Sequence, residues 1–136
     1  MKRILLACCM IAASCSFSYA QNAAPLPQNQ LPAVSKTEYT SQVTQLNTLI
    51  STNKMDAAKT KWDEVHRAIQ EGLRVTKYKI RDAQVAHNDA DVKKYTEVMM
   101  KQRDLYSTIL KLKEDMATNK TLLNDKLKEF GATIPQ

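Results

Sequence analysis

The sequence predicts an all-α protein: a three-helix antiparallel bundle dominated by a long hairpin of the coiled-coil type, with a short fourth C-terminal helix as the alternative. Three observations favour this fold class. No proline lies between Pro32 and Pro135, and Gly72 and Gly131 are the only glycines in the chain. Apolar residues recur every three or four positions, and β-branched residues form few runs. Because proline and glycine interrupt helices most strongly, this composition and spacing predict helices throughout.

Residues 1–20 are predicted to be a secretory signal peptide of the bacterial type. The segment has a basic start, an apolar run over residues 4–13 and small residues at Ser18 and Ala20, which suit cleavage between Ala20 and Gln21. The apolar run is shorter than the roughly 20 residues of a membrane-spanning helix. We therefore expect a periplasmic or secreted protein.

The three cysteines of the chain all lie in this segment, so cleavage after Ala20 leaves a chain without thiols or disulfides. The alternative is a lipoprotein cut before Cys15 and anchored through it. Small residues precede Cys15, but Ala12 stands where a larger aliphatic residue is usual. Loss of Lys2 and Arg3 lowers the net charge of +6 by two, to +4.

Residues 21–34 contain three prolines and no charged side chain, which predicts a proline-rich disordered tether. The helical domain is expected over residues 35–131, followed by a tail at 132–136. Its first helix, about 35–51, should begin with Ser35 as the N-cap in a capping box with Glu38. Its apolar positions have helical spacing; they are Tyr39, Val43, Leu46 and Ile50.

The second and third helices are expected at about 54–87 and 89–131, with Asn53 capping the second and Asn88 or Asp89 the third. A hairpin with its turn near residues 87–91 would place Gly72 opposite Tyr106. A break at 118–120 that folds the chain back is the alternative to a continuous third helix. The triplet there repeats that of 52–54, but no acidic residue follows it, so we expect the helix to continue.

The first helix can cover the second only as far as about Arg67, at 1.5 Å of rise per residue. Two helices cannot bury an apolar seam on their own, so the rest of the hairpin should serve self-association or a partner protein. The seam residues are Ile69, Leu73, Ile80, Tyr95, Met99 and Tyr106.

Basic residues recur along the second helix and suggest contact with anions or an acidic partner; they are Arg67, Arg74, Lys77 and Arg81. Outside the cytoplasm the available anions are lipid head groups, glycans and acidic proteins, and we do not expect nucleic acid. The alternative is a solvated helix flank with local pairs such as Glu71 with Arg74.

The sequence predicts no catalytic residue, no metal site and no cofactor. His66 and His87 are too far apart on one helix to share a metal, and His66 is expected to pair with Asp63 in water. No glycine-rich phosphate loop or nucleophile motif occurs.

We therefore expect a non-enzymatic, exported interaction or structural module of the bacterial cell envelope that acts through an exposed helical hairpin. One alternative is an electrostatic binder of anionic envelope components. Another is a holdase similar in shape to periplasmic chaperones, although the Leu-Thr-x-x-Gln repeats of the Spy-like group are absent.

Overall fold

The structure, a computed structural model, describes residues 35–136. The predicted signal peptide, its cleavage site at Ala20 and Gln21, the alternative anchor Cys15 and the proline-rich tether lie outside these residues. The described residues form helices and no strand, which confirms the all-α class. The helices are α1 (Lys36–Ser51), α2 (Met55–Val85), α3 (Asp89–Lys113) and α4 (Lys120–Thr133).

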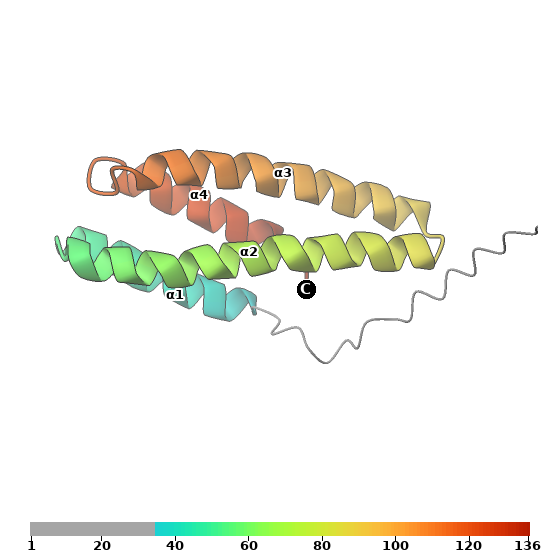
Figure 1. Ribbon diagram of the computed structural model, residues 1–136, viewed down its shortest axis with the longest axis horizontal. Helices are drawn as coiled ribbons and strands as arrows, with labels where there is room; N and C mark the ends of the chain where they lie inside the picture. The colour runs from blue at the N-terminus through green and yellow to red at the C-terminus, as the bar shows by residue number, and fades with distance from the viewer. Residues whose placement is uncertain (1–34) are drawn as a thin grey trace, which may run out of the picture. The chain divides into compact units, whose positions relative to one another are not determined.

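The helices form a closed ring in which each packs mainly against two others: α1 with α2, α2 with α3, α3 with α4, and α4 with α1. Figure 1 shows that α1 and α4 lie along only one half of the α2–α3 hairpin. We call this part the four-helix half. The remaining part, residues 76–99 with the α2–α3 turn, is called the distal hairpin.

The prediction of three helices with a continuous third helix is wrong, because α3 ends at Lys113 and α4 runs back along it. The turn between them contains neither glycine nor proline. Instead, the Thr118 amide donates to Asp115 Oδ1 at 3.0 Å, and Asn119 Nδ2 donates to the Leu112 carbonyl at 3.2 Å. Hydrogen bonds from Thr118 also lower the pKa of the Asp115 carboxyl.

Two of the predicted N-caps are confirmed. The Ser35 hydroxyl accepts from the Glu38 amide at 3.1 Å, and Asn88 Oδ1 accepts from the Asp91 amide at the same distance. Asn53 is not the N-cap of α2. It adopts a left-handed conformation with φ of 57°, and α2 begins after Lys54 without a side-chain cap.

The core of the four-helix half is centred on Tyr39 of α1 and Phe130 of α4, which are 1% and 0% exposed. Their ring centroids lie 5.9 Å apart. The Tyr39 hydroxyl donates to the Leu127 carbonyl at 2.9 Å, so the buried oxygen has a partner. This contact fixes α1 to α4.

Because of Tyr39, the stability of the protein should change with pH in the alkaline range. Burial raises the pKa of its hydroxyl above the ordinary value of about 10. Above that pH the unfolded chain releases a proton that the folded chain retains. The free energy of unfolding should therefore be at its full value below about pH 10 and fall above it by up to about 1.4 kcal/mol per pH unit.

Tyr39→Phe should cost about 1 kcal/mol at pH 7, since it leaves the Leu127 carbonyl without its donor. The cost should shrink as the pH rises from 9 to 11, because phenylalanine does not ionise. Urea unfolding of both proteins across this range measures the difference. A difference that stays constant would contradict the assignment of the effect to Tyr39.

The predicted pairing of Gly72 with Tyr106 is wrong. A Cβ at Gly72 would lie 3.2 Å from Cε1 of Phe130 and 3.4 Å from Cγ1 of Ile134, so this glycine faces the end of α4. Tyr106 packs instead beside His66, at an earlier level of α2. The turn was predicted near residues 87–91, but α2 ends at Val85 and α3 begins at Asp89, so Tyr106 faces an earlier residue of α2 than predicted.

Candidate functional site

The distal hairpin continues the core stripe of the four-helix half beyond the point where α4 ends. Gly72 of α2 lies against Ile134, and Gln102 Nε2 of α3 donates to the Thr133 carbonyl at 3.3 Å. Residues at helical spacing from Gly72 and Gln102 extend the same stripe toward the turn. We call them the distal face: Thr76, Lys79, Ile80 and Ala83 of α2, and Asp91, Tyr95 and Val98 of α3.

All residues of the distal face are buried or half-buried within one chain, although only two helices surround them. Neither α1 nor α4 extends along this part of the hairpin (Figure 1). A stripe that is fully covered in one half of a hairpin and only partly covered in the other is typical of a docking surface.

The predicted seam is divided by the fold. Ile69 is 0% exposed, and Leu73 and Tyr106 pack against the core, so the prediction that these three lie on an uncovered hairpin is wrong. The physical reason is α4, which returns along α3 and covers this level. Ile80 and Tyr95 remain half-buried on the distal face, and the half-buried Met99 borders it.

The predicted seam did not include several distal-face residues, among them Lys79 and Val98. Thr76 is fully buried, and its hydroxyl donates to the Gly72 carbonyl at 3.1 Å. Gln102, also 0% exposed, was missed as well, and its Oε1 has no hydrogen-bond partner among the described residues. The helical spacing that identified Ile80 and Tyr95 also runs through Lys79 and Gln102, but a search for apolar residues passes over these polar positions. Val98 was left out because the next residue, Met99, was assigned to the seam.

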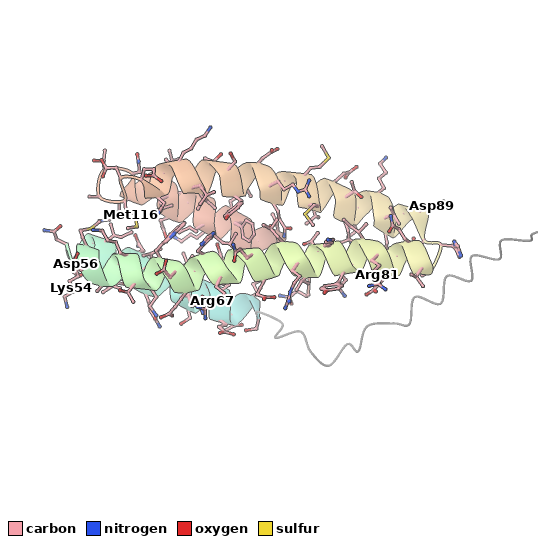
Figure 2. The ribbon with its side chains drawn as sticks, viewed as in Figure 1. Lys54, Asp56, Arg67, Arg81, Asp89 and Met116 are labelled. Atoms are coloured by element: carbon pink, nitrogen blue, oxygen red, sulfur yellow. The ribbon has the colours of Figure 1, made fainter. Side chains whose placement is uncertain are left out.

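The predicted basic residues lie on a different side of α2. At about 100° per residue, Arg74 and Arg81 lie roughly 160–180° around the helix from the centre of the distal face. Arg67 and Lys77 are exposed, whereas Arg74 and Arg81 are half-buried. Figure 2 shows Arg67 and Arg81 well apart along α2, with Arg81 near the turn to Asp89.

Arg74 is also bound within its own helix. Its Nη2 lies 2.8 Å from Glu71 Oε2, and its Nε donates to the same oxygen at 2.9 Å. The basic stripe is therefore partly neutralised, and it is separate from the distal face.

The prediction that His66 pairs with Asp63 is wrong. His66 Nε2 lies 2.6 Å from the Tyr106 hydroxyl oxygen, and its ring stacks against those of Trp62 and Tyr106 with centroids 5.9 and 5.7 Å apart. Asp63 is exposed. The stack joins α2 to α3, with Trp62 buried in the core, and has a structural role in the hairpin.

Other candidate sites are weak. A groove of about 120 Å³ between α1 and α4 is lined by Lys36, Tyr39, Val43, Lys128 and Gly131, among others. It is smaller than the roughly 300–1,000 Å³ of most small-molecule sites. Within residues 35–136, no group of three or more histidine, cysteine, aspartate or glutamate side chains could hold a metal ion.

No helix in the described part of the chain has the length and apolar character needed to cross a bilayer.

No family model, curated protein or solved structure matches the chain.

Proposed function

We propose that the protein is a non-enzymatic interaction module that is exported to the bacterial cell envelope and binds a protein partner through the distal hairpin. The four-helix half supplies the stability, and the distal hairpin supplies the contact surface. The observation that carries this proposal is the change from four helices to two along one continuous core stripe.

The chemistry of the distal face supports a helical protein partner. Ile80, Tyr95 and Val98 are half-buried and offer apolar and aromatic area, which drives association once it is removed from water. A bare two-helix layer leaves this area partly in contact with water. Helices laid against it would complete the packing that α1 and α4 provide elsewhere.

Electrostatic binding of anionic lipids, glycans or acidic proteins remains the second candidate, supported by Arg67, Lys77 and Arg81. Its support is smaller because residues 73–100 carry six basic and four acidic side chains, a net charge of only +2. Under this alternative, binding to vesicles rich in phosphatidylglycerol should be lost above physiological salt, where the Debye length falls below about 8 Å.

The proposal is tested by a photo-reactive amino acid, p-benzoylphenylalanine, placed at Val98 in the full chain and irradiated in the cells that export it. We expect a covalent adduct of discrete mass, because Val98 lies half-buried on the distal face. Leu122 of α4 is the matched control, since it is apolar and 50% exposed but lies in the four-helix half.

The adduct should form from position 98 and not from position 122. Equal adducts from both positions, or none from either, would contradict the proposal. A continuous range of adduct masses from position 98 would instead support the holdase alternative, in which the hairpin binds many unfolded chains.

A further inference from the structure

We infer that the partner of the distal hairpin is a second copy of this chain, whose own distal hairpin supplies the two missing helices. This inference rests on the function proposed above. It specifies the occupant of the distal face and its orientation.

The layer missing from the distal hairpin has the shape of a second helical hairpin. In the four-helix half, the α2–α3 layer is covered by a second layer of two antiparallel helices, α1 and α4. The open part of the hairpin therefore lacks a layer two antiparallel helices wide. A second distal hairpin has that width, the same length and the same residues, so each copy completes the other.

The position of the α1–α4 layer fixes the orientation of the second copy. The distal face lies on the side of the hairpin that α1 and α4 cover at the other end, because it continues the stripe of Gly72 and Gln102. If two copies packed in parallel, their α1–α4 layers would occupy the same space. In an antiparallel pair, each distal hairpin lies end to end with the α1–α4 layer of the other copy. The result is a four-helix arrangement along the whole dimer.

Two charged side chains of α2, Lys79 and Asp82, are placed to meet the second copy. His66 contacts Tyr106 and thus marks the side of α2 that faces α3. Lys79 and Asp82 lie about 140° and 160° around the helix from His66, in opposite senses and therefore about 60° from each other, so both are on the side turned away from α3. Neither forms an ion pair with any residue between 35 and 136.

These two charges are self-complementary in an antiparallel pair. If Lys79 of one copy lies opposite Asp82 of the other, the two-fold axis passes between positions 80 and 81, and the second Lys79–Asp82 pair forms by symmetry. The α2–α3 turn of each copy, at about residue 87, then lies opposite residue 74 of its partner, about 13 residues from the partner's own turn and just short of Gly72. This register fits the free length of the hairpin.

Asp82 is otherwise placed unfavourably. It lies in the last turn of α2, which contains no basic residue, and a carboxylate there is repelled by the negative end of the helix dipole. An ammonium group from a second copy would offset this repulsion.

The contact is small. Two helices about 9 Å apart and 13 residues long give a face of roughly 20 by 20 Å. That is below the about 800 Å² per partner of a standard interface, so we expect a reversible dimer in the micromolar range.

Sedimentation equilibrium of the exported protein, purified after processing in the cell, tests the inference. The wild type should dimerise with rising concentration. Lys79→Glu and Asp82→Lys should each weaken the dimer about tenfold or more, because each creates two like-charge contacts across the two-fold axis. Lys93→Glu, on exposed α3 surface, is the control and should have a much smaller effect.

The decisive sample is an equimolar mixture of the Lys79→Glu and Asp82→Lys chains. In a heterodimer the new carboxylate at position 79 faces the new ammonium at position 82, and the unchanged Asp82 and Lys79 face each other. The mixture should therefore dimerise within about threefold of the wild type, although neither variant does so alone. A folding defect in either variant could not produce this rescue.

A wild type that stays monomeric to millimolar concentration, or a mixture that gains no dimer, would overturn the inference. The proposed function fails separately. An adduct from position 98 with the mass of this chain joined to a different protein would retain the docking surface and reject the second copy. No adduct at all would reject the surface itself.

Discussion

Phe130→Ala is expected to lower the free energy of unfolding by about 3–5 kcal/mol, the range for truncating a fully buried aromatic side chain. Phe130 is the side chain that α4 inserts between α1 and α2. Its ring packs against Tyr39, and its edge lies 3.2 Å from where a Cβ at Gly72 would be. Loss of the ring opens a cavity where three helices meet.

Denaturant unfolding of Phe130→Ala against wild type measures this effect. Leu122→Ala on the same helix is the control, since Leu122 is exposed and its truncation should change stability by about 0.5 kcal/mol or less. Similar losses for the two variants would show that α4 does not insert Phe130 into the core.

Gly131→Ala is expected to cost about 1–3 kcal/mol, although alanine is the better helix residue. A Cβ at Gly131 would lie 2.7 Å from Cε1 and 2.9 Å from Cδ1 of Tyr39. The Tyr39 ring has little room to move, because it is buried and its hydroxyl is bonded to Leu127. The added methyl group must therefore separate α1 from α4.

Gly72→Ala is the matched control, because it makes the same substitution in a buried helical position. Its Cβ would meet Phe130 and Ile134 at 3.2 and 3.4 Å, and Ile134 lies after the end of α4, where it can adjust. The gain in helix propensity of about 1 kcal/mol should offset most of the crowding. Thermal melts should rank Gly131→Ala well below Gly72→Ala, and the reverse order would contradict the packing of Tyr39 on Gly131.

Local signals in the sequence were sufficient for the first three helix starts to within a residue or two. Ser35 and Asn88 act as caps because their short polar side chains reach the amide three residues on, and this chemistry is readable without tertiary structure. Asn53 and His87 adopt left-handed backbone conformations, and both lie in turns that the polar residues of the sequence had predicted.

The break between α3 and α4 could not be predicted in this way. Met116 and Leu123 flank it and are seven residues apart, so the apolar pattern stays in phase as if the helix were continuous. The turn is held by Asp115 and Asn119 rather than by glycine or proline. In the sequence, the residues that form these bonds are one polar stretch among many, and nothing marks them as a turn.

Because the favoured prediction had no separate fourth helix, it placed only part of the candidate docking surface correctly. Sequence reasoning correctly noted that the first helix is too short for the hairpin, but it left Ile69, Leu73 and Tyr106 uncovered because it had no helix to place over them. Ile80 and Tyr95 lie beyond the reach of both short helices. The open surface therefore survives in a shorter form, nearer to the turn.

The central claim is that the distal hairpin serves binding and the four-helix half serves stability. Deleting residues 77–83 and 91–97 together tests it most directly. Each deletion removes one heptad, which keeps every remaining helix face in register and shortens the hairpin by about 10 Å.

The shortened chain, with p-benzoylphenylalanine at position 98, should still unfold cooperatively with a melting temperature close to that of the full chain. It should also lose the photo-adduct that the full chain forms from the same position. A shortened chain that no longer folds, or one that forms the adduct at the original yield, would contradict the division of the molecule into a scaffold and a docking surface.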